Sequence, residues 1–409
     1  MNATKAMTLL AAVAVGLSAQ ALTLAVKDVK IAQRYPWNGL VDIDYTVECD
    51  DKDADVYVYP VGYDADMNMS VALFTLTGDG ANGKTVKAGT HRMTWDMAKD
   101  MGANYNRAKF SVKMHAYSGA APYLVVDLSE GSNAAKYKVE YLSEMPGAAW
   151  PAEYKTTKLV LKLVAPGKFM MGSPVDEPNR STGNNGNDER LHEVTITKPF
   201  YMGVFELTQK QYTLVMGSNP SNYKGDPRPV EYVTYKTIRG TANGANWPGS
   251  RQVDGDSFLG KLRARTDITF DLPTEAQWEY TCRAGTATMY NNGKSTGIAE
   301  LARYSGNRDD GKGGYSEHTT VGSYQPNAWG FYDMLGNVSE WCIDRWGVMS
   351  ASPATDPAGL ENGSVRVIRG GDWNYGSQYC RSAQRTRYSF STSNYDNRVG
   401  FRLACVPAE

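Results

Sequence analysis

The pattern of apolar and polar residues changes near residues 146–151. Because one fold does not account for both patterns, we expect two domains of different architecture. Before this change, apolar and aromatic residues alternate with polar ones in residues 41–47, and residues 56–59 and 123–126 are short strand-like runs of β-branched, aliphatic and aromatic residues. Turns rich in glycine and aspartate separate these runs, and no helical period is sustained. Alternation with a period of two predicts an antiparallel β-sandwich, immunoglobulin- or fibronectin-like, over residues 22–150.

Residues 151–409 contain more glycine and tryptophan, with long irregular connections between short helices. Two helices can be placed because a threonine is followed three residues later by a glutamine, the capping-box pattern that begins a helix. Each helix is expected to end at a glycine, which readily takes a left-handed conformation. The predicted pairs and stops are Thr208 and Gln211, ending at Gly217, and Thr274 and Gln277, ending at Gly285. The second part is therefore expected to be an irregular α+β domain.

The N-terminal residues resemble a signal peptide. Lys5 precedes the apolar residues 6–17, and small residues follow up to Ala21. This run is too short to span a bilayer, so we interpret residues 1–21 as a signal peptide cleaved near Leu22. A buried N-terminal helix is the alternative. No later run reaches the ~20 apolar residues that a spanning helix needs. We expect a secreted, periplasmic or cell-surface protein without a membrane span.

The charge and the metal-binding residue types argue against several functions. Net charge is −1 and no run of lysines and arginines occurs, so nucleic acid is not an expected partner. None of the four histidines forms a close pair with ligand spacing, which argues against a zinc or iron site. All five cysteines follow the predicted signal peptide, and their odd number leaves at least one without a partner in the chain.

Residues 369–402 are almost free of aliphatic side chains but rich in tyrosine, serine and asparagine. This composition is typical of recognition surfaces, where rigid amphipathic rings supply contact area and small polar groups adapt to the ligand. The alternative is a polar loop that binds nothing. The candidate ligand-binding residues are Asp372, Asn374, Tyr375, Ser377, Tyr379, Gln384, Thr386, Tyr388, Phe390, Asn394, Tyr395 and Asn397.

Several motifs follow one another in the second part. They are FMMGS at 169–173, HEV at 192–194, FELT at 205–208, LPTEAQWEY at 272–280, CRAG at 282–285, GFYDMLGNVSEW at 330–341, RGG at 369–371 and GFR at 400–402. In this order they resemble the formylglycine-generating enzyme (sulfatase-modifying factor) family, over about residues 159–404. The resemblance implies that family's irregular α+β fold, which is related to C-type lectins. It does not include the predicted sandwich.

The resemblance also allows a test for catalysis. Members that oxidise a cysteine to formylglycine use two copper(I)-binding cysteines, five residues apart, after the Gly-Gly pair. Cys380 falls on the second position and is the one candidate catalytic residue, but Tyr375 replaces the first. Asp372 stands in place of the active-site serine. A single cysteine cannot form a two-thiolate site, so we do not expect copper.

The resemblance implies a structural calcium site. Asp333, Gly336, Val338 and Glu340 match the family's second calcium site, with two carboxylates and two backbone carbonyls as ligands. Such hard oxygen ligands suit calcium. The alternative is that Asp333 and Glu340 form ordinary hydrogen bonds or salt bridges.

The resemblance also implies a disulfide. Cys282 matches a family cysteine that bridges to the last strand, and Cys405 lies two residues beyond the expected partner position. Cys282 with Cys405 is therefore one candidate pair, and Cys342 with Cys380 is another, but the sequence does not fix the connectivity.

Three functions remain open. The first is a secreted module that binds a protein or glycan ligand through residues 372–398, diversified by a retroelement that mutates adenines. The second is a metal-dependent oxidoreductase of the formylglycine-generating or nonheme-iron type, acting on protein or thiol substrates. The third is a structural surface protein. We favour the first, because the C-terminal composition suits recognition and one of the two copper cysteines is missing.

Overall fold

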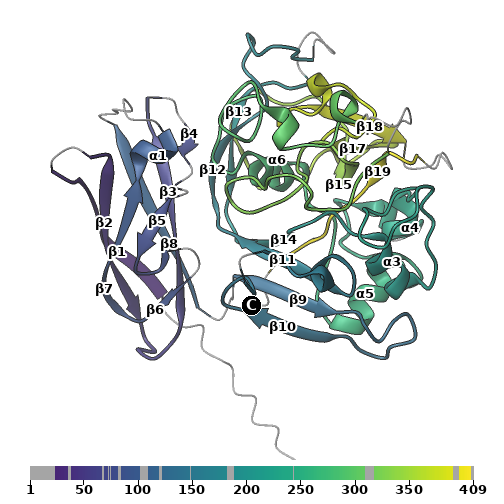
Figure 1. The fold of residues 1–409 in the computed structure, drawn as a ribbon, viewed down its shortest axis with the longest axis horizontal. Helices are drawn as coiled ribbons and strands as arrows, with labels where there is room; N and C mark the ends of the chain where they lie inside the picture. The colour runs from purple at the N-terminus through teal and green to yellow at the C-terminus, as the bar shows by residue number, and fades with distance from the viewer. Residues whose placement is uncertain are drawn as a thin grey trace, which may run out of the picture.

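The computed structural model describes residues 24–35, 38–66, 69–71, 73, 75–81, 84–101, 109–118, 122–147, 149–181, 188–242, 244–308, 317–389 and 396–406. It is a mixed α/β structure with more strand than helix (Figure 1). The sequence predictions for residues 1–21 lie outside the described residues. Within them, no helix is long and apolar enough to cross a membrane.

The N-terminal part consists of two sheets packed around one core (Figure 1). In β2 (Leu40–Cys49), buried and less buried side chains alternate, as the sequence predicts. One sheet has the order β1 (Leu24–Gln33), β2, β7 (Gly89–Asp96) and β5 (Leu76–Gly78). The other contains β4 (Met69–Val71), β3 (Val56–Asp64) and β6 (Thr85–Val86), with β8 (Phe110–Ser118) also paired with β3. The short helix α1 (Met97–Met101) follows β7.

The boundary between the two parts lies earlier than predicted. Residues 123–126, assigned from sequence to the N-terminal sandwich, belong to β9 (Tyr123–Asp127), which pairs with β10 (Lys138–Leu142) and β11 (Lys158–Val164). This sheet continues through β14 (Phe200–Gly203) to β20 (Ala404–Cys405). A short apolar run identifies a strand but not its partner, and the buried side chains of β9 pack in the cores of the second part.

Two smaller sheets and a group of short helices complete the second part. One sheet joins β12 (Gly167–Met171), β13 (His192–Ile196) and β16 (Ala354–Thr355). The other has the order β18 (Arg385–Ser389), β17 (Val365–Arg369), β15 (Ser339–Arg345) and β19 (Val399–Gly400). The α-helices are α3 (Gln209–Met216), α4 (Tyr235–Arg239), α5 (Phe258–Thr266) and α6 (Glu275–Arg283). Single 3-10 turns are η2 (Ala152–Lys155), η3 (Gly244–Asn246), η4 (Ile298–Glu300), η5 (Ser305–Asn307) and η6 (Ser377–Tyr379).

Both predicted capping boxes are confirmed. The Thr208 hydroxyl accepts from the Gln211 amide and the Gln211 side chain accepts from the Thr208 amide, and Thr274 and Gln277 do the same. Helix α3 ends at Gly217, which is left-handed as predicted. Helix α6 ends one residue before the predicted glycine, because Ala284 itself takes a left-handed conformation with φ 46°.

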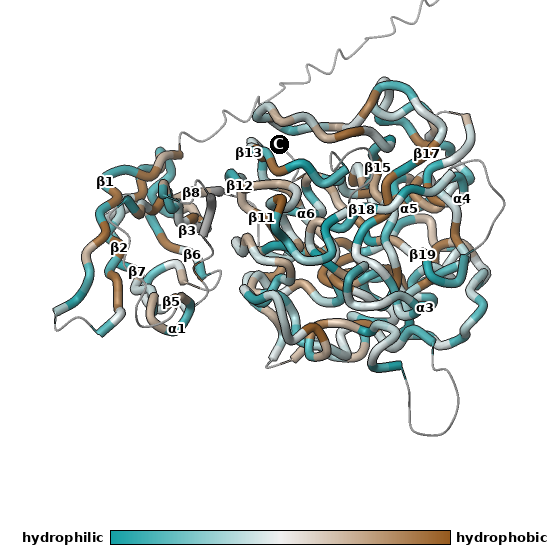
Figure 2. Tube along the Cα trace, turned by 90° about the horizontal axis from the view of Figure 1, so that it is seen from above, coloured by the Kyte–Doolittle hydropathy of each residue, from teal (hydrophilic) through white to brown (hydrophobic). Residues whose placement is uncertain are grey.

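The two parts face each other through defined strands. In both views, β3 and β8 of the N-terminal part lie on the side nearest β11 and β12 (Figures 1 and 2). Strand β4 contacts β12 directly. Side chains of both parts therefore line the space between them, including the buried strand β11.

Candidate functional site

Buried arginines hold both ends of residues 369–402. Arg369, at the end of β17, forms an ion pair with Glu279 of α6 and donates to the carbonyl of Ala383 at 2.8 Å. Arg402 donates to both oxygens of Glu340 on β15, at 2.5 and 2.6 Å. A buried guanidinium is tolerated when carboxylates and carbonyls satisfy it. The two ends are thus fixed to the core.

Two further arginines fix the middle of this segment through pairs with buried carboxylates. Arg381 is fully buried, and its guanidinium donates to Glu189 at 2.7 and 2.8 Å and to Glu177 at 2.7 Å. Arg385, at the start of β18, donates to both oxygens of Glu275 at 2.5 and 2.7 Å. These pairs join the segment to residues 177–189 and to α6.

A tight turn follows the Gly-Gly pair. The buried Asp372 carboxylate accepts from the backbone amide of Asn374 at 2.9 Å, and the Tyr375 amide donates to the Asp372 carbonyl at 3.2 Å. Gly371 has φ +71°, and a Cβ there would lie 2.5 Å from the carbonyl oxygen of Tyr379. Only glycine fits this position without displacing the backbone. Between Asp372 and Cys380, the side chains of Asn374, Tyr375, Gln378 and Tyr379 are exposed.

The outward side chains form what we call the tyrosine surface: Asn374, Tyr375, Gln378, Tyr379 and Arg398. Tyr375 and Tyr379 are 40% and 44% exposed, and their ring centroids lie 5.1 Å apart. The guanidinium of Arg398 lies 5.1 Å from the centre of the Tyr375 ring. Asn374 is exposed and bonded to Arg308. The Arg398 guanidinium is also paired with Asp396 at 2.7 and 2.8 Å, so the two large exposed rings are the main contact area that this surface offers.

The structure separates the other predicted contact residues. Asp372 is buried, and Gln384 is tied to Arg381 and to the Arg385 carbonyl. Tyr388 bonds to Asp396 and packs against Trp341 at 6.0 Å between ring centroids, so it supports the segment from inside. Ser377 and Asn397 are half-buried, and Thr386 is exposed on β18. Phe390, Asn394 and Tyr395 lie outside the described residues.

A group of buried carboxylates lies beneath this segment. The Glu340 carboxylate, bonded to Arg402, also accepts from the indole of Trp278 at 2.8 Å. Glu206 accepts from the Asn337 side chain at 2.6 Å, and burial raises its pKa well above the usual range, with Asp333 and Glu340 adding to the shift. Burial also raises the pKa of Asp333 to about 6. Three acids thus share one buried arginine.

A comparison with known proteins identifies the second part. Residues 149–406 match the model of the sulfatase-modifying factor enzyme 1-like domain. The chain belongs to this family. The formylglycine-generating enzyme of Thermomonospora curvata is 35% identical over 154 residues, covering 33% of this chain and 49% of that enzyme. The aligned part thus spans about half the length of that relative.

Other relatives carry different names. The chaperone protein LppX of Paenibacillus barcinonensis is 30% identical over 42% of this chain and 69% of its own length. The serine/threonine-protein kinase pkn1 of Chlamydia pneumoniae is 38% identical over 56% of this chain and 36% of its own. Among solved structures, Treponema denticola variable protein 1 is 25% identical, with a TM-score of 0.49, covering 61% of this chain and 96% of that one.

Cys380 lacks the surroundings of a reactive thiolate. Its side chain is fully buried, and burial raises the pKa of the thiol well above its usual range, with the Asp372 carboxylate adding to the shift. A raised pKa disfavours the thiolate that would attack or bind a soft metal. The residue at the family's first copper position is the exposed Tyr375. The site thus presents an aromatic surface where family oxidases carry a cysteine.

The structure forms neither predicted disulfide. All five cysteines are described, and all are free and buried. Cys282 and Cys405 pack in different cores, the first on α6 and the second on β20, where it pairs with Tyr201 across the sheet. Cys342 and Cys380 share one core but remain thiols. Each cysteine acts here as a small apolar side chain.

The family's calcium set fits in part. Asp333 Oδ1 is buried and accepts no hydrogen bond, which leaves an oxygen available to a cation. Glu340, in contrast, has both oxygens bonded to Arg402, so its charge is already balanced. Among the described residues, no group of three or more His, Cys, Asp and Glu side chains is arranged to hold a metal. Of the two carboxylates in the set, Asp333 is therefore the one with an oxygen available to bind calcium.

Sequence reasoning did not find two buried groups beside this site. Glu206 lies in the FELT motif, and that motif was the only signal for its role. Glu231 and His318 lie 3.4 Å apart in a buried pair, and burial lowers the pKa of His318. Tyr223 packs edge-on against both His318 and Trp373, so this pair supports the base of the tyrosine surface. No sequence signal relates Glu231 to a histidine 87 residues later.

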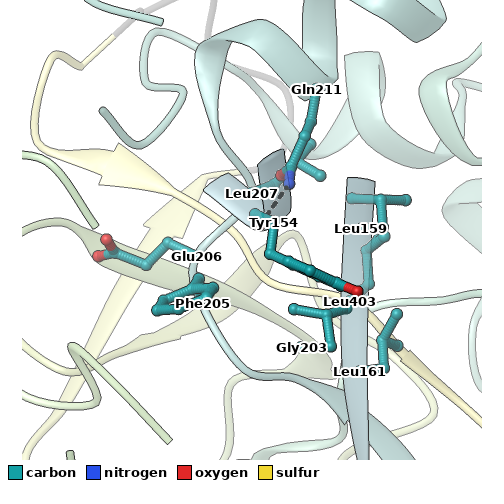
Figure 3. A pocket seen from close by; sticks show the side chains of 10 residues that line it. Tyr154, Leu159, Leu161, Gly203, Phe205, Glu206, Leu207, Gln211 and Leu403 are labelled. Atoms are coloured by element: carbon teal, nitrogen blue, oxygen red, sulfur yellow. Dashed lines mark hydrogen bonds between the residues drawn. The ribbon is translucent and has the colours of Figure 1, made fainter. Parts of the chain in front are cut away.

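A small hollow beside Glu206 is not a ligand site. It lies between β11, β14 and α3 and has a volume of about 10 Å³, roughly the space of one water molecule. Figure 3 shows Leu159, Leu161 and Leu207 around it, and the carboxylate of Glu206 pointing away. The Gln211 amide donates to the Tyr154 carbonyl at 3.3 Å across this space. The hollow is a packing feature of the core.

Proposed function

We propose that this protein is a binding module of the sulfatase-modifying factor family, and that the tyrosine surface contacts a protein or glycan ligand. The observation that carries the proposal is the exposed pair Tyr375 and Tyr379, whose ring centroids lie 5.1 Å apart. Both stand on a turn that begins at the buried Asp372 and ends at the buried Cys380. Large exposed rings are enriched where proteins meet partners. In a family oxidase, the place of Tyr375 would hold a copper cysteine.

The arrangement of this surface suits binding because little has to be ordered. The turn is fixed by Asp372 and Gly371, and Arg381 anchors it to Glu177 and Glu189. A tyrosine has two side-chain torsions, so each ring supplies contact area at small entropic cost. Arg398 packs beside the Tyr375 ring while its guanidinium donates to both oxygens of Asp396, so it holds the ring in place rather than offering a free charge.

Glycan and protein arrays probed with the chain from residue 22 onward test this proposal. The wild type is expected to give a reproducible ligand, and the double variant Tyr375→Ala and Tyr379→Ala is expected to bind it at least about tenfold more weakly. Tyr141→Ala is the control, because Tyr141 is 49% exposed on β10. Equal binding by the double variant would remove the tyrosine surface from the proposal.

We further propose that retroelement mutagenesis diversifies this surface. Several of its residues are reachable from asparagine codons by changes at adenines, the pattern that such mutagenesis leaves. Sequencing the gene's neighbourhood provides the test. A reverse-transcriptase gene and a template repeat of the region coding for residues 372–398 are expected there, and their absence would refute this part.

We propose that residues 1–21 direct export, with the binding module acting outside the cytoplasm. The composition of residues 1–21 supports this, with Lys5 ahead of an apolar run. N-terminal sequencing of the protein expressed in its own host tests it. The mature chain is expected to begin near Leu22, and an intact Met1 would contradict export by cleavage.

We also propose a structural calcium ion held by Asp333 with the carbonyls of Gly336 and Val338, and with Glu340 nearby. The buried, unbonded Asp333 Oδ1 supports it. Arg402 balances Glu340, so calcium would add the positive charge that remains to be supplied beside Asp333 and Glu206, and would stabilise the fold. Thermal unfolding with 1 mM calcium against excess chelator is the test. A higher Tm with calcium is expected for the wild type and not for Asp333→Asn, and equal Tm values for the wild type would exclude the site.

A further inference from the structure

A cavity of about 290 Å³ lies where the N-terminal part meets the second part. Its walls come from β3 on one side and from β9, β11 and α6 on the other. Most lining side chains are aliphatic or aromatic, among them Val61, Leu76, Val164 and Phe331. The volume is about twice that of an engineered apolar cavity that holds benzene. The space therefore suits a ligand larger than benzene with an apolar body.

Of the described residues that line this apolar cavity, one carries a charged side chain. Lys162 projects from β11, and its ammonium donates to the carbonyl of Trp329 at 2.7 Å and lies 5.6 Å from the centre of the Tyr123 ring. No aspartate or glutamate lines the cavity among the described residues. Burial lowers the pKa of Lys162 to about 8. An ammonium in such surroundings is costly unless an anion balances it.

We propose that this cavity binds an amphiphilic monocarboxylate, with the carboxylate against Lys162 and the apolar tail in the cavity. An apolar tail matches the walls, and a carboxylate matches the unbalanced ammonium, which has donors beyond the one given to Trp329. Among the described residues, Tyr123 and Tyr280 are the other titratable side chains that line the cavity. The site is separate from the tyrosine surface and does not depend on it.

Calorimetric titration of the mature two-part protein with decanoate tests the proposal. Saturable binding with one site is expected at pH 7, and Lys162→Met is expected to weaken it at least about tenfold. Lys158→Met is the matched control, because Lys158 lies on the same strand, also beside a tyrosine ring, but pairs with Glu153 outside the cavity. Decanol, with the same tail and no charge, is expected to bind more weakly than decanoate.

Two further measurements keep the result interpretable. Affinity for decanoate is expected to fall as pH rises from 7 to 9, because Lys162 loses its proton with a pKa of about 8. Val61→Trp, which fills the cavity from the N-terminal side, is expected to abolish binding while circular dichroism shows an unchanged fold. Equal affinity of wild type and Lys162→Met, or no saturable binding of decanoate by the wild type, would overturn the proposal.

Discussion

The two faces of residues 369–402 differ in what holds them. On the inner face, Arg369, Arg381 and Arg402 are fully buried and paired with carboxylates from other parts of the chain. On the outer face, the exposed rings of Tyr375 and Tyr379 lie beside each other, with Arg398 next to Tyr375. We therefore expect the inner face to determine where the segment lies, and the outer face to tolerate substitution. The proposed variable binding surface depends on this division.

The largest expected effect comes from the inner face. Arg402→Met removes the cation that pairs with Glu340, close to Glu206 and Asp333. A buried carboxylate left without its partner typically costs about 3–5 kcal/mol. We expect a loss of that size in the free energy of unfolding, measured by urea denaturation.

A control variant tests whether burial causes this effect. Lys27→Met breaks a pair with Glu48 in which both side chains are more than half exposed, and it should cost under about 1 kcal/mol. If both variants lose the same small amount, the buried arginines do not anchor the segment.

Asp372 lies at the start of the turn that joins the two faces. Its titration should change the free energy of unfolding with pH. Burial raises its pKa to about 6, above the ordinary 3.8, so the folded state binds its proton more tightly than the unfolded state. Stability from this group is therefore present below pH 3.8 and is lost as pH rises through 6. Relative to wild type, Asp372→Asn is expected to gain up to about 3 kcal/mol between pH 4 and 7.

The measurement is a series of urea denaturations from pH 4 to pH 7. Asp267→Asn, in which an exposed aspartate paired with Lys136 is replaced, serves as the control. A constant stability difference between Asp372→Asn and wild type across this range would show that Asp372 does not titrate there.

A substitution at Gly371 tests whether the turn must keep its conformation for both stability and ligand binding. Gly371→Ala combines a positive φ with a Cβ 2.5 Å from the Tyr379 carbonyl, so we expect a loss of about 1–3 kcal/mol and weaker ligand binding. Gly293→Ala has a similar φ of +76° with no neighbour within 4 Å, so it measures the conformational strain alone. Equal losses in the two variants, measured by thermal unfolding, would mean that the turn has room to relax.

Local patterns in the sequence predicted local structure correctly. The capping boxes of Thr208 and Thr274 begin helices, and β2 alternates in burial, because these features depend on neighbours within a few residues. Tyr375 and Tyr379, which the sequence offers as contact residues, are exposed, and their contact with a ligand stays a prediction.

Features that depend on distant residues could not be predicted. The pair of Arg381 with Glu189 joins positions 192 residues apart, and nothing in either neighbourhood identifies the other. The sheet to which β9 belongs is set by its pairing with β11, which its apolar sequence alone does not specify. Cys282 and Cys405 lie in separate cores. Cys405 is two residues from the partner position that the resemblance implies, and closeness in sequence to that position does not place its thiol near Cys282.

The smallest expected change in stability is on the outer face. The double variant Tyr375→Ala and Tyr379→Ala removes two exposed rings that lie 5.1 Å apart, so its free energy of unfolding should stay within about 0.5 kcal/mol of wild type. Urea denaturation of the same preparation used for the arrays measures it. A loss above about 2 kcal/mol would place these tyrosines among the residues that hold the fold. Unchanged stability together with lost binding would instead show that the outer face is free to vary, because the buried arginines and the turn at Gly371 and Asp372 fix the segment without these two rings.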